Sequence, residues 1–185
     1  LRGLADPWGG RADLAARRIR CVGRPADRFE EDALRILRAL RFAATLGFEL
    51  EEQTALAVHE KKAFLCRVAP ERLREEFFRL LCGPSSAAVL DDYLDVFCIF
   101  VPELGPMKGF LQHNSYHDRD VWGHTLAALE AAPADEPAVR LAALLHDVGK
   151  PECFTQDADG VGHFYGHAAR SAEIAHALLR RLHCD

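Results

Sequence analysis

Residues 29–42, with the sequence FEEDALRILRALRF, constrain the fold of this chain most strongly because apolar and charged residues recur there with helical spacing. The apolar residues that would share one helix face are Leu34, Ile36, Leu37 and Leu40. A second row of charged residues is spaced three apart and comprises Asp32, Arg35, Arg38 and Arg41. The pattern predicts one amphipathic helix with a buried apolar stripe and a winding charged face.

The charged row has two interpretations. In the first it is a solvated helix face, whose i,i+3 ion pair contributes about 0.2–0.5 kcal/mol. In the second it binds a nucleotide, because an ionised Asp only accepts hydrogen bonds and Arg only donates them. Cytosine and adenine both present an amino donor beside a ring-nitrogen acceptor, so Asp plus Arg could select them against uracil and guanine. Arg38 and Arg41 would then meet phosphates as bidentate donors.

The residues from Glu31 to Phe42 resemble the EDxxRxxRAxRF motif of the bacterial class II tRNA nucleotidyltransferases, the CCA-adding enzymes and their poly(A) polymerase relatives. The resemblance implies that Asp32 and Arg35 recognise the base of CTP or ATP, and that Arg38 and Arg41 contact the nucleotide. Two neighbouring segments also match: residues 6–14 resemble a DxxGGxxDL segment that precedes the nucleotide-binding helix in this family. An ERxxxE element of the family, which braces that helix, matches Glu71, Arg72 and Glu75.

Composition is that of an ordinary globular protein, with 49% hydrophobic and 28% charged residues and a net charge of -5. Residues 1–82 hold 16 Lys and Arg against 13 Asp and Glu, whereas residues 83–185 hold 7 against 15. The basic bias of the first part suits a polyanion partner, and the family resemblance implies that this partner is tRNA. Six cysteines without a CxxC pair, no signal peptide and no long apolar run predict a cytoplasmic protein that does not cross a membrane.

The second half contains a histidine-rich pattern that resembles the HD superfamily of metal-dependent phosphohydrolases. The run from HNxYHxxDVWxHT to GHFYGHxxxSAE looks like the HD domain fused to many bacterial CCA-adding enzymes. Imidazole and carboxylate ligands suit a divalent transition metal, here Mn, Ni, Co or Fe, which activates water and neutralises phosphate charge. By this resemblance the candidate ligands are His124, His146, Asp147 and His167, with Lys150 as a possible phosphate contact. The remaining C-terminal histidines are predicted to be surface or packing residues: His113, His117, His163, His176 and His183.

Two departures from the family pattern lead us to expect a fragment. HD sites commonly take a last Asp from a downstream helix, and Asp185 is a poor candidate, so the metal site is expected to be incomplete. The head domain's Gly-Ser phosphate loop and its paired carboxylates, which would hold Mg2+ for nucleotidyl transfer, are missing from the sequence. Asp157-x-Asp159-Gly160 lacks the Glu of a calcium-binding EF-hand loop and is predicted to be a hairpin turn.

The expected fold is all-α. Further helices are predicted over residues 51–62, with Ala55, Leu56 and Val58 inward, over 70–81 opening at Pro70, over 87–100, and from Ser171 onward. Proline and glycine crowd into residues 102–109 and predict a boundary there. We therefore expect a remnant linker over 1–26, a nucleotide- and tRNA-binding neck and body over 27–108, and an HD-type domain over 109–185.

The resemblance implies a tRNA nucleotidyltransferase that adds CCA to tRNA 3′ ends using CTP and ATP. Two alternatives remain open at this point. The chain could act as an HD phosphohydrolase on 2′,3′-cyclic phosphate or nucleotide substrates. It could also be a non-catalytic RNA-binding helical module, which would bind tRNA in a salt-sensitive way and hydrolyse nothing.

Overall fold

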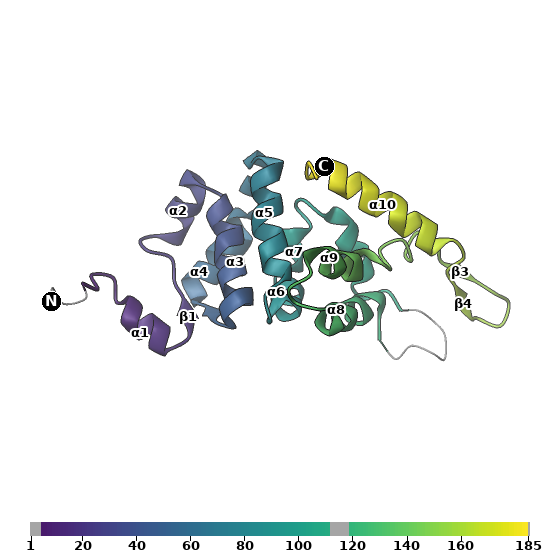
Figure 1. Ribbon diagram of the computed structural model, residues 1–185, viewed down its shortest axis with the longest axis horizontal. Coiled ribbons are helices and arrows are strands. Elements are labelled where there is room, and N and C mark those ends of the chain that lie inside the picture. Colours follow the sequence, from purple (N-terminus) through teal and green to yellow (C-terminus); the bar gives the residue numbers. More distant parts are fainter. Residues whose placement is uncertain (1–4, 112–118, 185) are drawn as a thin grey trace.

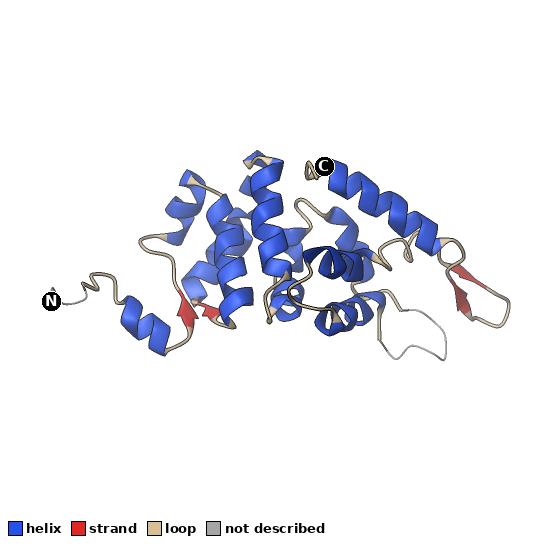
Figure 2. Cartoon of the chain, viewed as in Figure 1, coloured by secondary structure: helices blue, strands red, loops and turns tan. Residues whose placement is uncertain are grey.

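The computed structural model describes residues 5–111 and 119–184, and nearly all regular structure in them is helical (Figure 2). The all-α expectation is confirmed, with two short strand pairs as the additions. The elements up to the middle of the chain are α1 (Gly10–Ala15), β1 (Arg18–Ile19), α2 (Pro25–Glu31), α3 (Leu34–Leu46), β2 (Glu49–Leu50), α4 (Glu52–Lys61), η1 (Lys62–Arg67), α5 (Pro70–Leu81), α6 (Ser86–Asp92), α7 (Leu94–Phe97) and η2 (Pro102–Met107). The later elements are α8 (Val121–Ala131), α9 (Pro137–Leu145), β3 (Thr155–Gln156), β4 (Gly162–His163) and α10 (His167–Arg181).

The molecule is elongated, with its elements laid out roughly in chain order (Figure 1). Helix α1 lies at one end and the β3–β4 hairpin at the other, while α10 runs back from the hairpin toward α5. Strand β1 pairs in parallel with β2, with Arg18 opposite Glu49. Strands β3 and β4 form the predicted antiparallel hairpin, with Thr155 opposite His163. Within the described residues, no helix combines the length and the apolar character that a membrane crossing requires.

The prediction of a single helix over residues 29–42 is wrong, because the helix is interrupted at Asp32, between α2 and α3. Asp32 has an extended backbone (φ -149°, ψ 100°), and its Oδ1 accepts a hydrogen bond from the Leu34 amide at 3.2 Å. A short acidic side chain satisfies amides at a helix start that would otherwise lack partners, which favours a new helix over a continued one. The apolar stripe itself is confirmed: Leu34, Ile36, Leu37 and Leu40 are all buried. Gly47, in the left-handed region (φ 62°), ends α3.

Three other predicted helices need adjustment. Helix α4 matches the prediction within a residue at each end, but Leu56 is 57% exposed because Ala57 and Val58 face the core instead. The helix predicted over 87–100 is broken at Tyr93 into α6 and α7, and this break brings both Leu94 and Phe97 into the core. Helix α10 begins at His167 rather than Ser171. The helix predicted over 70–81 is confirmed from Pro70 to Leu81.

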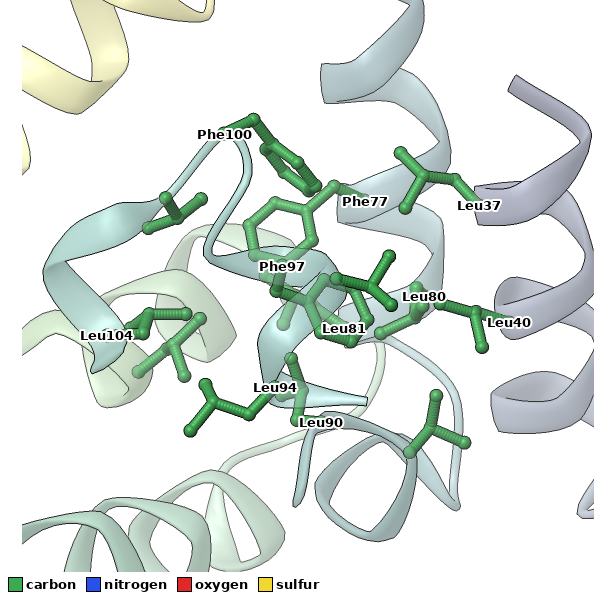
Figure 3. Close-up of a cluster of buried hydrophobic side chains, with 14 of the residues drawn as sticks. Leu37, Leu40, Phe77, Leu80, Leu81, Leu90, Leu94, Phe97, Phe100 and Leu104 are labelled. Atoms are coloured by element: carbon green, nitrogen blue, oxygen red, sulfur yellow. The ribbon is translucent and has the colours of Figure 1, made fainter. Parts of the chain in front are cut away.

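One hydrophobic core runs through the described chain, from Phe29 in α2 to Leu182 after α10. Its centre lies where α3, α5 and α7 meet (Figure 3). Phe77 of α5 contacts Phe97 and Phe100 with ring centroids 5.9 Å and 5.3 Å apart. Apolar contacts of this kind dominate folding stability, so the neck and HD-type regions are expected to unfold together.

A buried arginine joins the two regions. Arg140 of α9 is 3% exposed, and among the described residues its acceptors are all uncharged oxygens. Its Nε donates to the Leu81 carbonyl at 2.8 Å, and its Nη2 donates to Ser86 Oγ at 2.5 Å. Further acceptors are the carbonyls of Leu129, Ala132 and Gly83 at 2.5, 3.0 and 3.4 Å. The guanidinium thus ties α9 to the α5–α6 turn and to the end of α8.

Polar contacts reinforce the same seam at two more places. The Trp122 indole donates to Asp91 Oδ1 at 2.9 Å, which links α8 to α6. At the far end of α10, His183 Nδ1 lies 2.7 Å from Glu71 Oε1, and Arg181 pairs with Glu103 at 2.8 Å. Helix α10 is therefore held against α5 and η2 at its C-terminal end.

Candidate nucleotide-binding surface and metal centre

The break between α2 and α3 places the first two predicted base-reading residues within one turn of each other. The Arg35 amide donates to the Asp32 carbonyl at 3.1 Å. Asp32 Oδ2 lies 3.3 Å from Arg72 Nη2, so the carboxylate has a cation beside it. Arg35 Nη1 donates to Glu31 Oε2 at 3.1 Å and to the Arg28 carbonyl at 3.2 Å. Both side chains are about one-third exposed and can reach a ligand.

The other two arginines of the row differ from each other. Arg41 is 16% exposed, pairs with Glu76 at 2.5 Å and lies over the Phe42 ring, 4.1 Å from its centroid. Arg38 is 52% exposed and only 4.0 Å from the same Glu76. The close contact with Glu76 holds Arg41 in place, whereas the longer distance from Glu76 to Arg38 leaves Arg38 open to solvent. The structure therefore makes Arg38 the more accessible cation of the two.

Glu76 was not among the predicted support residues, which were Glu71, Arg72 and Glu75. Only Arg72 of those three contacts the α2–α3 junction, through Asp32. Glu71 instead bonds His183 at the end of α10, and Glu75 is exposed. Helical spacing could have identified Glu76, because it follows Arg72 by four residues and so shares its face of α5.

The three predicted histidine ligands lie around the fourth predicted ligand, a buried carboxylate in the second region. His124 comes from α8, His146 caps α9, Asp147 follows it, and His167 opens α10. His146 Nε2 lies 3.1 Å and His124 Nε2 lies 3.6 Å from Asp147 Oδ2, while His167 Nε2 lies 3.6 Å from Oδ1. The ligand atoms of His124, His146 and Asp147 all lie within 4.8 Å of one another, which suits a shared metal, whereas His167 is outside this group and approaches the other carboxylate oxygen.

The orientation of two imidazoles also fits metal binding. His146 Nδ1 lies 2.8 Å from the Ala143 carbonyl, and His167 Nδ1 lies 2.7 Å from the Phe164 carbonyl. Because a carbonyl only accepts, each Nδ1 must carry the proton and donate it. In both rings Nε2 is therefore the nitrogen that faces Asp147. Backbone or carboxylate acceptors commonly fix metal-binding histidines in this way.

Asp147 itself is a buried acceptor with unused capacity. Its Oδ2 is buried and makes no hydrogen bond of good geometry within the described residues. Lys150 Nζ nevertheless lies 2.8 Å from it as an ion pair. Burial alone would raise the pKa of Asp147, but the adjacent His146 and Lys150 outweigh burial and lower it. The same carboxylate raises the pKa of His146. Such a carboxylate stays ionised and available to a cation.

The glycine of the HDxGK sequence permits this convergence. A Cβ on Gly149 would lie 2.7 Å from the Ser171 amide nitrogen and 2.9 Å from the His167 carbonyl oxygen, both backbone atoms of α10. The Gly149 amide also donates to Ser171 Oγ at 3.0 Å. Only glycine allows α10 to approach closely enough for His167 to reach Asp147.

The remaining predicted residues lie as follows. Lys150 is 7% exposed and paired with Asp147, so it borders the site from the inside. His163 pairs with Asp157, His183 pairs with Glu71, and His176 is exposed. His113, His117 and Asp185 lie outside the described residues.

Comparison with known proteins defines the class of both regions. Residues 47–104 match the family model described as "Probable RNA and SrmB- binding site of polymerase A", and residues 115–183 match the HD domain. The chain thus combines a helical region similar to this segment of polymerase A with an HD domain.

Three curated relatives match along most of the sequence. The A-adding tRNA nucleotidyltransferase of Deinococcus radiodurans is 39% identical over 98% of this chain and 44% of its own length. The Multifunctional CCA protein of Thioalkalivibrio sulfidiphilus is 38% identical over 97% of this chain and 45% of its own. The CC-adding tRNA nucleotidyltransferase of Thermus thermophilus is 40% identical over 80% of this chain and 37% of its own. The chain belongs to the tRNA nucleotidyltransferase family, and it spans less than half the length of these relatives.

Proposed function

We propose that this chain is the nucleotide-selecting, tRNA-binding and HD part of an enzyme that adds CCA, or part of it, to tRNA 3′ ends from CTP and ATP. The proposal divides the chain as the sequence does, with a neck and body over 27–108 and an HD-type domain over 109–185. The transfer step requires carboxylates that hold Mg2+, a role that the family resemblance gives to a head domain. The observation that carries the proposal is the α2–α3 junction, where Asp32 and Arg35 share one turn beside Arg72.

Base selection follows from the hydrogen-bonding groups at this junction. Asp32 accepts from the exocyclic amino group of cytosine or adenine, and Arg35 donates to the adjacent ring nitrogen. Uracil and guanine place a carbonyl oxygen opposite Asp32, which leaves two acceptors facing each other at a cost of about 1–3 kcal/mol. Arg38, half exposed on the next turn, is placed to meet the phosphates, and Arg41 reaches them only by exchanging its pairing with Glu76.

Binding of the four nucleoside triphosphates, measured by isothermal titration calorimetry on the purified 185-residue chain, tests this role. We expect CTP and ATP to bind more tightly than UTP and GTP, and Arg35→Ala to remove the difference. Arg24→Ala is the matched control, since Arg24 is an exposed arginine at the start of α2. Unchanged discrimination against UTP and GTP in Arg35→Ala would contradict the assignment.

A second proposed function belongs to the HD region. The convergence of His124, His146 and Asp147, whose ligand atoms all lie within 4.8 Å of one another, favours a metal-dependent phosphohydrolase. A divalent metal held there, of the Mn, Ni, Co or Fe type, would activate water and neutralise charge on the phosphate. Lys150 holds Asp147 ionised from the buried side, and the backbone carbonyls of Ala143 and Phe164 hold two imidazoles in their ligating form.

The expected substrates are 2′,3′-cyclic phosphates or nucleotides. For a cyclic phosphate, the oxygen of water forms a bond to phosphorus, one of the two ring P–O bonds breaks, and the released ribose oxygen takes the proton. Turnover of 2′,3′-cyclic AMP with added Mn, Ni, Co, Fe or Mg measures this activity. We expect metal-dependent turnover that His146→Ala loses and His176→Ala retains, because His176 is an exposed histidine of α10. No turnover with any metal, together with salt-sensitive tRNA binding, would leave a non-catalytic RNA-binding module.

A further inference from the structure

The hairpin before α10 carries two aromatic rings in an unusual arrangement. The rings of His163 and Tyr165 are stacked, with centroids 5.3 Å apart and planes 12° from parallel. Asp157, across the hairpin turn, fixes the imidazole through a contact of 3.0 Å to Nε2. Tyr165 is 78% exposed, so most of its ring faces solvent. A large aromatic ring contributes little to folding in such a position.

The residue between them faces the other way. Phe164 packs against Phe110 and Phe154, with centroids 6.4 Å and 5.6 Å apart. Lys150, next to the Asp147 carboxylate, lies 5.4 Å from the centre of the same ring. His163 ends β4, where successive side chains point to opposite sides, and the stacking contact places the Tyr165 ring beside the His163 ring. Phe164 therefore anchors the segment, and His163 and Tyr165 together form its outer face.

This outer face lies next to the metal centre along the chain. Tyr165 precedes His167 by two residues, and two residues span at most about 7 Å. His167 in turn lies 3.6 Å from Asp147. The distance of at most about 7 Å between Tyr165 and His167 is comparable to the separation between the phosphate and the base of a single nucleotide.

We propose that the His163–Tyr165 stack is a base-stacking platform for the substrate of the HD site, which therefore takes nucleoside phosphates in preference to simple phosphate esters. The inference rests on the proposed phosphohydrolase function and adds the part of the substrate that is recognised. Every nucleobase has a π face, so stacking tolerates all four bases. The platform thus selects substrates that carry a base but does not distinguish between the four bases.

A pair of substrates isolates the base. Adenosine 2′,3′-cyclic phosphate carries one, and methyl β-ribofuranoside 2′,3′-cyclic phosphate has the same sugar and phosphate with a methoxy group in its place. Stacking of one base on an aromatic side chain corresponds to about 5- to 150-fold in affinity, and an exposed ring lies at the lower end. We expect Tyr165→Ala to lower kcat/KM for the adenosine compound about 5- to 30-fold, mainly through KM, and to leave the base-free compound unchanged. Tyr165→Phe should stay within about twofold of the parent for both.

A binding measurement separates failure of the platform from failure of the hydrolase. Titration calorimetry of 3′-AMP against the metal-free chain is expected to show weaker binding by Tyr165→Ala than by the parent and Tyr165→Phe. If the parent binds 3′-AMP in this Tyr165-dependent way but hydrolyses neither substrate, the hydrolase proposal fails and the platform stands. Equal loss on both substrates, or nucleotide binding that Tyr165→Ala leaves intact, would overturn the platform.

Discussion

The two candidate sites of this chain use charge in opposite ways. On α3 the arginines have carboxylate partners: Arg35 pairs with Glu31, and Arg41 pairs with Glu76. In the HD region a single buried carboxylate, Asp147, faces three imidazoles and one ammonium group. In the first arrangement each arginine charge is neutralised by a glutamate, and an anionic ligand can bind by replacing that glutamate as the partner of the arginine. The second concentrates ligand atoms around one point.

The difference separates residues that hold the fold from residues that are available for chemistry. Glu76 is 13% exposed and satisfies Arg41, so its contribution is to stability and to the position of that arginine. His124 and His146 are each more than one-third exposed and contribute little burial. Their convergence on Asp147 has no evident structural benefit, which favours a functional role. The predictions below test this separation.

The largest effect is expected at the seam that makes the two regions one body. Arg140→Met removes the guanidinium donors to the Leu81 carbonyl and the Ser86 hydroxyl, and the one to the Leu129 carbonyl, which keeps its bond from the Ala132 amide. A buried acceptor without a partner costs about 1–3 kcal/mol, and two are left here, so we expect the free energy of unfolding to fall by at least about 2 kcal/mol. Urea denaturation followed by circular dichroism measures the loss.

Arg79→Met is the control for that experiment, because Arg79 is an exposed arginine of α5. It should shift the unfolding free energy by less than about 0.5 kcal/mol. Two results would contradict this role: Arg140→Met could have the same unfolding free energy as the parent, or one of its two regions could unfold separately with the stability it has in the parent. Either result would show that the buried arginine does not join the two regions.

An intermediate effect compares the two kinds of site directly. Glu76→Gln is expected to destabilise the metal-free chain by about 1–2 kcal/mol, since the half-buried Arg41 loses a charged partner. His146→Ala should leave the unfolding free energy of the metal-free chain within about 0.5 kcal/mol, because more than one-third of that side chain is exposed and Asp147 keeps Lys150 as a partner. Thermal melts of both variants after chelation measure these shifts. A larger loss of stability in His146→Ala than in Glu76→Gln would show that the imidazole has a structural role.

The smallest effect concerns a surface cluster of the neck region. Burial would raise the pKa of Asp95, but Lys62 at 2.6 Å and His59 at 2.9 Å outweigh it and lower the pKa. A lowered folded-state pKa gives stability that is present above the unfolded value of about 4 and is lost as the pH falls through the folded value. Asp95→Asn should therefore cost about 0.2–1 kcal/mol near pH 6 and almost nothing near pH 2.

Urea midpoints at the two pH values measure that difference. Asp92→Asn is the matched control, an exposed aspartate of α6. A deficit in Asp95→Asn that is the same at both pH values would show that the ion pairs are not its cause.

The sequence predicted most of the helices, the buried stripe of α3 and both clusters of charged residues, because each depends on local spacing. It did not predict the break at Asp32, since a side-chain hydrogen bond to the Leu34 amide competes there with continuation of the helix. Nor did it identify Glu76 or Arg140, whose roles depend on which helices pack together. A single charge within the apolar stretch AVRLAALL of α9 was the available signal for Arg140. The residue-by-residue roles at both sites stay predictions for the experiments above.

Metal content of the purified chain tests whether the residues around Asp147 form a metal centre. After loading with Mn, Ni, Co or Fe and removal of unbound ions, elemental analysis should find close to one metal ion per chain. His146→Ala should lower the affinity at least about 100-fold and bring the content near background, while His176→Ala should match the parent. Equal metal content in His146→Ala and the parent, or none in either, would contradict a metal centre at Asp147.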